Sequence, residues 1–120
     1  MSEIKSFDFL VLGAGPGGYV AAIRASQLGL KTAIIEAEHV GGVCLNWGCI
    51  PSKSIITQAK KYSHIPDLEK LGLKIDASGL NYEKVYEKSR AAAQKLSKGV
   101  SFLLKKNNIT LIKGYGKLVN

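Results

Sequence analysis

The sequence has few of the residues that build metal sites or disulfide frameworks. Among its 120 residues are only two cysteines, two histidines and three prolines. Because these cysteines and histidines lack the spacing of zinc ligands, we expect no metal site. No apolar run reaches the length of a membrane span, and residues 1–8 hold acidic side chains in place of the apolar core of a secretory signal. These absences predict a cytoplasmic protein with no membrane partner.

The chain also lacks clustered charge, although its net charge is +8. The lysines are spread over the second half, with only short doublets such as Lys60–Lys61 and Lys105–Lys106. RNA-binding strands typically interleave basic and aromatic residues, and no such pattern occurs here. The distribution favours a solvated helix face and no nucleic-acid partner.

The only two cysteines, Cys44 and Cys49, lie close together in the sequence. In a regular α-helix their Cα atoms would be about 8.7 Å apart, whereas a disulfide needs about 4.4–6.8 Å. A bond between them therefore requires a distorted turn, which Gly48 and Pro51 favour. Because so short a loop gives little entropic stabilisation, such a bond would be catalytic rather than structural. Two free cysteines packed as small hydrophobic residues are the alternative.

The beginning of the chain predicts a βαβ unit. Residues 7–12 are a short apolar run typical of a buried parallel strand, and residues 31–36 are a second β-rich run. Residues 19–30 between them read as an alanine-rich helix. With a third strand predicted at 109–112, we expect a parallel sheet in a three-layer arrangement.

The turn after the first predicted strand has the spacing Gly-x-Gly-x-x-Gly at Gly13, Gly15 and Gly18. Gly13 makes the tight turn, Gly15 lets the backbone approach a pyrophosphate, and Gly18 lets helix and strand pack closely. The helix N-terminus offers free N–H groups to the phosphates. Glu36, at the end of the second run, can accept hydrogen bonds from an adenosine ribose. The unit therefore predicts a dinucleotide site, without distinguishing FAD from NAD.

The rest of the chain reads as a helical scaffold. Residues 43–63 are expected to form one helix, irregular at its start, and residues 64–79 a looser segment. Asn81 is the predicted N-cap of a long helix that runs to about Lys106. The side chains expected to face inward are Ile50, Ile55, Ile56 and Ala59 in the first helix and Val85, Ala92, Leu96, Val100 and Leu103 in the second.

The cysteine-containing segment resembles the redox-active disulfide motif of the flavin-dependent pyridine nucleotide–disulfide oxidoreductases. The family pattern Gly-Gly-x-Cys-x-Asn-x-Gly-Cys-x-Pro-x-Lys is matched at every fixed position. Leu45, Ile50 and Ser52 are more similar to the dihydrolipoamide dehydrogenase branch than to glutathione or mercuric reductases. The resemblance covers essentially the whole chain and implies an α/β fold, with a Rossmann-like parallel sheet and flanking helices.

The resemblance also implies a set of site residues, with FAD bound in this segment and NAD in a later domain. Cys44 and Cys49 would form the redox-active disulfide, with Cys44 exchanging with the substrate and Cys49 lying against the flavin. Lys53 would lie near the flavin ring. The implied cofactor-binding residues are Gly13, Gly15, Gly17, Gly18, Glu36, Gly41, Gly42, Val43, Cys44, Lys53, Gly114 and Gly116.

Family chains are several times longer than this one. Residues 1–120 would therefore be the N-terminal part of the FAD-binding domain, without the NAD-binding, central and interface domains. We expect this part to be inactive alone, because the catalytic His–Glu pair of the interface domain has no match here. The complete enzyme would be a homodimer that oxidises dihydrolipoamide on the lipoyl domains of 2-oxoacid dehydrogenase complexes and reduces NAD+. Another reductase of the family, or a nucleotide-binding module without redox chemistry, are the alternatives.

Overall fold

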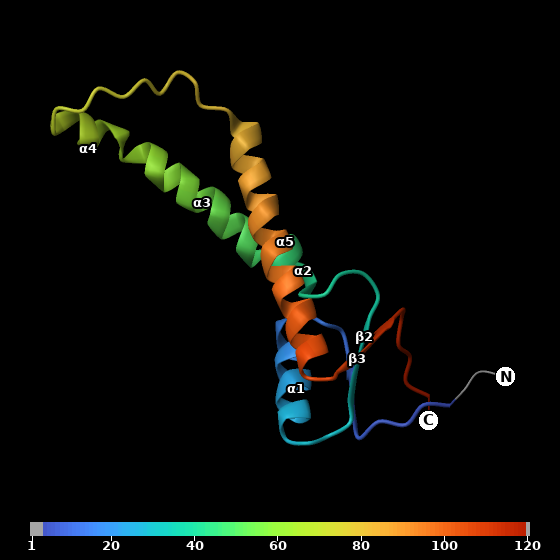
Figure 1. The fold of residues 1–120 in the computed structure, drawn as a ribbon. Helices are drawn as coiled ribbons and strands as arrows, with labels where there is room; N and C mark the ends of the chain where they lie inside the picture. Colours follow the sequence, from blue (N-terminus) through green and yellow to red (C-terminus); the bar gives the residue numbers. More distant parts are fainter. Residues whose placement is uncertain (1–3, 120) are drawn as a thin grey trace.

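The computed structural model describes residues 4–119 as a small parallel sheet with helices packed against it. The sheet lies at one end of the molecule, and a pair of helices extends away from it (Figure 1). The predicted α/β class, a Rossmann-like parallel sheet with flanking helices, is therefore confirmed. The elements in chain order are β1 (Phe9–Leu12), α1 (Pro16–Gln27), β2 (Thr32–Glu36), α2 (Gly42–Asn46), α3 (Cys49–Ser63), α4 (Ile65–Lys70), α5 (Tyr82–Lys106) and β3 (Thr110–Lys113).

The three strands are parallel and lie in the order β1-β2-β3. In the central strand, Ala33 is opposite Leu10 of β1 and opposite Thr110 of β3. The three predicted strands are confirmed, with ends that differ from the predicted ones by one or two residues. Ile34 is fully buried because β2 has a neighbouring strand on each side and a helix layer above it.

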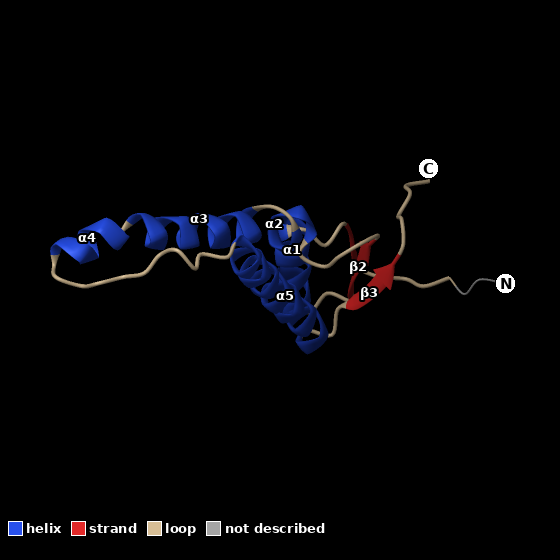
Figure 2. Cartoon of the chain, turned by 90° about the horizontal axis from the view of Figure 1, so that it is seen from above, coloured by secondary structure: helices blue, strands red, loops and turns tan. Residues whose placement is uncertain are grey.

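Both crossover connections place their helices on the same side of the sheet (Figure 2). α1 packs against β1, β2 and α5, while α5 also contacts β3. On the opposite face Leu10 and Leu12 are 51% and 48% exposed, since no helix of residues 4–119 covers them. The three-layer arrangement is therefore wrong for this part of the chain. The core between sheet and helices consists of Ala14, Ala22, Ile34, Leu45, Val100, Leu104 and Ile109.

α3 and α5 diverge as they leave the sheet, which makes the molecule long and narrow (Figure 1). The radius of gyration is 20.4 Å, whereas a compact domain of this length would have about 14 Å. A groove of about 650 Å³ separates the two helices and is lined by Ile55, Ala59, Tyr62 and Val85 among others. Ala59 is therefore exposed, and Ile56 is 52% exposed, so their prediction as inward-facing residues is wrong.

The structure also corrects three helix predictions. α1 begins at Pro16, three residues earlier than predicted, because proline is well suited to the first helical position. Residues 43–63 form two helices rather than one, with a break at Trp47–Gly48, and the segment predicted to be loose contains α4. The positions where these helices begin depend on local backbone geometry, which the pattern of hydrophobic residues does not predict.

The long helix α5 is confirmed, and the Asn81 side chain accepts a hydrogen bond from the Glu83 N–H at 2.8 Å. Its predicted buried stripe is only partly right. Leu96 and Leu103 are 44% and 41% exposed, since the helix turns a neighbouring face toward α2 and the sheet. That face carries smaller side chains near α2, and its buried residues are Ser89, Ala93, Val100 and Leu104.

Candidate functional site

The two cysteines lie on either side of the break between α2 and α3. Cys44 is inside α2, and Cys49 is the first residue of α3. The Gly48 N–H turns back to donate to the Val43 carbonyl at 2.7 Å. A Cβ at Gly48 would lie 3.1 Å from that carbonyl oxygen and 3.3 Å from the Cys44 Cα. The tight turn between the cysteines therefore favours a residue without a side chain.

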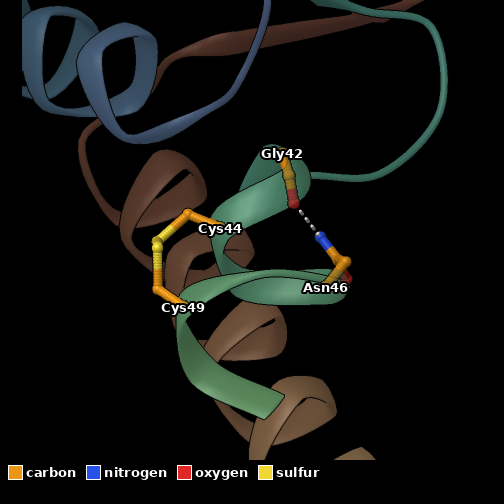
Figure 3. Close-up of a disulfide and its surroundings, with 4 residues drawn as sticks. All are labelled: Gly42, Cys44, Asn46 and Cys49. Atoms are coloured by element: carbon orange, nitrogen blue, oxygen red, sulfur yellow. Dashed lines mark hydrogen bonds between the residues drawn. A yellow bond between two sulfur atoms is a disulfide. The ribbon is translucent and has the colours of Figure 1, made fainter. Parts of the chain in front are cut away.

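This turn brings the cysteines into a disulfide (Figure 3). Their Cα atoms are 4.6 Å apart, within the range that a disulfide requires and about half the distance in a regular helix. The alternative of two free cysteines is wrong. Cys44 is half-buried and packs against the hydrophobic core, whereas Cys49 is exposed at the start of α3. Exposure alone favours Cys49 as the exchanging cysteine, while the family resemblance favours Cys44, so their separate roles remain predictions.

Side-chain hydrogen bonds hold the segment that leads into the disulfide. Asn46, which is 8% exposed, donates to the Gly42 carbonyl at 2.9 Å (Figure 3) and to the Val40 carbonyl at 3.1 Å. Two residues of α5 reach the same region: Ser97 Oγ donates to Val40 and Arg90 Nη1 donates to Asn46, both at 2.6 Å. Sequence reasoning missed all three side chains. Only Asn46 had a signal, as a fixed position of the cysteine motif.

The glycine turn after β1 has the shape expected for a phosphate cradle. Gly13 has φ +94°, and a Cβ at Gly18 would collide with the Gly13 carbonyl. A Cβ at Gly15 or Gly17 would meet nothing within 4 Å, so the backbone at the start of α1 is open. The first N–H groups of this helix lack helical acceptors and are available to a phosphate. Among the predicted roles, the tight turn at Gly13 and the close packing at Gly18 agree with this geometry.

The disulfide segment lies directly against this glycine turn. Gly41 and Gly42 have positive φ angles of 98° and 60°. The Gly41 N–H donates to the Ala14 carbonyl at 2.8 Å, and a Cβ at Gly42 would lie 2.8 Å from the Gly15 Cα. A side chain at either position would separate the two turns or strain the backbone. The structure thus brings together two motifs that lie about thirty residues apart.

Glu36 joins the end of β2 to the glycine turn. Its carboxylate accepts hydrogen bonds from the N–H groups of Ala14 at 2.7 Å and Glu38 at 2.8 Å. Partial burial raises the pKa of Glu36, but hydrogen bonds from Glu38, Ala14 and nearby backbone N–H groups outweigh it and hold the pKa below its usual value of 4.5. An ionised carboxylate has about four acceptor positions, and the two hydrogen bonds with close geometry, from Ala14 and Glu38, leave positions that a ribose could use.

The turn after β3 lies beside Glu36. The Gly114 N–H donates to the Glu36 carbonyl at 3.0 Å. A cavity of about 210 Å³ is lined by Gly13, Glu36, Gly114 and Gly116 together with four other residues. Four of the predicted cofactor-binding residues, Gly13, Glu36, Gly114 and Gly116, therefore lie at one edge of the sheet, at the carboxyl ends of its strands.

Lys53 and Val43 are the remaining predicted site residues. Lys53 is exposed on α3, one turn after Cys49, and Val43 is 71% exposed one residue before Cys44. Both lie on the helices that carry the disulfide. Within residues 4–119 there is no group of acidic, histidine or cysteine side chains placed to hold a metal ion.

The sequence model of the family described as pyridine nucleotide-disulphide oxidoreductase matches residues 7–120. The chain belongs to this family. Dihydrolipoyl dehydrogenases of Rhizobium etli, Zymomonas mobilis and Bacillus subtilis are 52%, 49% and 46% identical to the chain over 115, 112 and 113 residues. These alignments cover 95%, 93% and 94% of this chain but 24% of each relative, so the chain spans about a quarter of their length.

The predicted membership of the pyridine nucleotide–disulphide oxidoreductase family is thereby confirmed, and these relatives carry the name of the predicted branch. None of the helices in residues 4–119 has the length and apolar character that crossing a membrane requires.

Proposed function

We propose that this chain forms the redox-disulfide and FAD-binding segment of a dihydrolipoyl dehydrogenase. The observation that carries the proposal is the contact between two turns: the Cys44–Cys49 segment packs against the glycine turn through the Gly41–Ala14 hydrogen bond and the close approach of Gly42 to Gly15. A dinucleotide on the glycine turn would extend toward the disulfide. The names of the relatives favour dihydrolipoamide over glutathione or mercuric ion as substrate.

The backbone of the glycine turn fits FAD. Open space at Gly15 and Gly17 leaves room for the pyrophosphate at the start of α1. Glu36 lines a cavity together with Gly114 and Gly116, which would suit a ribose and an adenine. Gly41, Gly42 and Val43 would then hold the phosphates, and Lys53 would lie on the flavin side of the site. When bound, FAD supplies the acceptor for the electron pair that the cysteines carry.

The chemistry of the cysteines is thiol–disulfide exchange. A dihydrolipoamide thiolate attacks the Cys44 sulfur, the Cys44–Cys49 bond breaks, and Cys49 leaves as a thiolate. The N-terminus of α3 stabilises that thiolate, because Cys49 is the first residue of the helix. The second substrate thiol loses its proton and attacks the mixed disulfide, which releases lipoamide and a Cys44 thiol. Two electrons then reside on the cysteine pair, one substrate proton is on Cys44, and the other is in solvent.

The remaining parts of the proposal concern the whole protein. Residues 1–120 form the N-terminal part of the FAD-binding domain, and NAD+ binds outside this chain. The protein is a cytoplasmic homodimer whose substrate is carried on lipoyl domains of 2-oxoacid dehydrogenase complexes. The assignment of residues 1–120 to one part of a longer protein is supported by the relatives, which are about four times longer than the chain and 52% and 49% identical to it over the aligned quarter.

The test is a substrate comparison on the natural protein that carries this sequence. Dihydrolipoamide with NAD+ should give NADH, and Cys44→Ser should abolish the reaction. Glutathione disulfide and mercuric ion, each offered with NADPH, are the matched alternatives. Faster turnover with either of these would contradict the proposal. A protein that binds FAD but has no turnover with any of the three would support a nucleotide-binding module instead.

A further inference from the structure

The break between α2 and α3 leaves the end of α2 without its helical hydrogen-bond donor. In a continuous helix the Asn46 carbonyl would accept from the N–H of Ile50. α2 instead ends at Asn46, and the N–H groups of Trp47 and Gly48 both donate to Val43, at 2.8 and 2.7 Å. A carbonyl at a helix end needs a donor from elsewhere.

Arg90 supplies this donor from α5. Its Nη1 atom donates to the Asn46 carbonyl oxygen at 2.6 Å, although the two residues are 44 positions apart in the sequence. Arg90 is half-buried and Asn46 is buried. Hydrogen bonds from a guanidinium are roughly twice as strong as neutral ones, and partial burial limits competition from water. Arg90 thus ties the turn between the cysteines to a helix of 25 residues.

The other side-chain hydrogen bonds in this region do not reach the turn from a distant element. Asn46 binds carbonyls of Val40 and Gly42, which precede the cysteines. Ser97 comes from α5, as Arg90 does, but it binds Val40. The Arg90 hydrogen bond, by contrast, joins α5 to the segment between Cys44 and Cys49.

We propose that Arg90 positions the cysteine pair for disulfide closure; this inference rests on the proposed redox function of Cys44 and Cys49. In the reduced state the covalent link across the turn is gone, and the Arg90 hydrogen bond still holds the end of α2. A turn held in this shape keeps the Cα atoms near their separation of 4.6 Å. That proximity raises the effective concentration of one thiol at the other. Arg90 therefore favours the disulfide over the dithiol.

The experiment measures the thiol–disulfide equilibrium of the natural protein in dithiothreitol redox buffers. Reduction breaks the Cys44–Cys49 bond and forms one in cyclic oxidised dithiothreitol, with two electrons and two protons passing to the protein. Alkylation followed by mass spectrometry of the cysteine peptide counts the trapped thiols. Arg90→Gln should shift the equilibrium toward the dithiol by about tenfold, or about 30 mV. Arg90→Lys retains a charged donor and should shift it less.

Two variants of α5 serve as matched controls. Ser101→Ala removes a hydrogen bond within α5, from Ser101 Oγ to the Ser97 carbonyl, and Lys95→Gln removes one exposed positive charge. Both should keep the wild-type equilibrium. An unchanged equilibrium in Arg90→Gln would overturn the positioning role. A shift toward the disulfide would also overturn it, because it would mean that the Arg90 charge stabilises a thiolate. A wild-type bond that dithiothreitol cannot reversibly reduce would instead contradict the proposed function itself.

Discussion

Replacing Glu36 with glutamine tests the junction between β2 and the glycine turn. The carboxylate accepts from two backbone N–H groups, at 2.7 and 2.8 Å, whereas a glutamine amide has one acceptor oxygen and places an NH₂ group where the second acceptor was. A hydrogen bond to a charged group contributes about 1.5–3 kcal/mol. Because Glu36 is only half-buried and solvent screens its charge, we expect Glu36→Gln to lower the free energy of unfolding by about 1–2 kcal/mol at pH 7.

The pH dependence of this difference has a defined sign. The pKa of Glu36 in the folded chain lies below its usual value of 4.5, so its stabilisation is fully present above that value. It is lost as the pH falls through the lower pKa of the folded state. The difference between wild type and Glu36→Gln should therefore be largest at neutral pH and shrink in acid below about pH 4.5.

The assay is urea unfolding followed by circular dichroism at pH 7 and in acid, with FAD retention measured on the same samples. Glu38→Gln is the matched control, because Glu38 is an exposed carboxylate two residues away. The Glu36 variant should also bind FAD about tenfold more weakly through lost ribose hydrogen bonds. Equal unfolding midpoints for the two variants at pH 7 would refute the role assigned to the Glu36 carboxylate.

Two further predictions concern the cysteine segment. In Gly48→Val the added Cβ would lie 3.1 Å from the Val43 carbonyl oxygen and 3.3 Å from the Cys44 Cα, so the turn should open. Titration of the unreduced protein should then find two free thiols, where wild type has none. A closed disulfide in this variant would show that the turn does not need a glycine. In the flavin-loaded protein, Cys44→Ser should leave a Cys49 thiolate that gives a long-wavelength absorption band, and Cys49→Ser should abolish it. A band that persists only in Cys49→Ser would reverse the two roles.

The fold was largely predictable from local patterns. The strands follow from short apolar runs, and the Gly13–Gly18 turn places the first crossover helix between two of them. Asn81 marks the start of α5 because an asparagine cap is a local hydrogen bond. The buried stripe of α5 was less predictable, since the choice between Leu96 and Ala93 depends on how closely α2 approaches.

The candidate site, too, was only partly predictable from the sequence. The cysteine spacing and the glycines indicated a distorted turn and a phosphate cradle. The contact of Arg90 with Asn46 could not be predicted, because it joins residues 44 positions apart and depends on a helix break. The hydrogen bond from the Ala14 N–H to the Glu36 carboxylate was missed for a similar reason, because it depends on how β2 ends beside the glycine turn.

The proposed function depends on one step, the reduction of the Cys44–Cys49 disulfide by a dithiol substrate. The most direct measurement is an anaerobic titration of the natural protein with dihydrolipoamide in the absence of NAD+, followed by acid quenching, alkylation and mass spectrometry of the cysteine peptide. With the first equivalent, each added substrate molecule should yield one lipoamide, and its two electrons should appear either on the cysteine pair or on the flavin. A second equivalent should reduce both, so that the flavin is reduced and both cysteines are alkylated. Equally fast flavin reduction in a Cys44→Ser, Cys49→Ser double variant, or cysteines that stay bonded in excess substrate, would contradict a redox role for this disulfide.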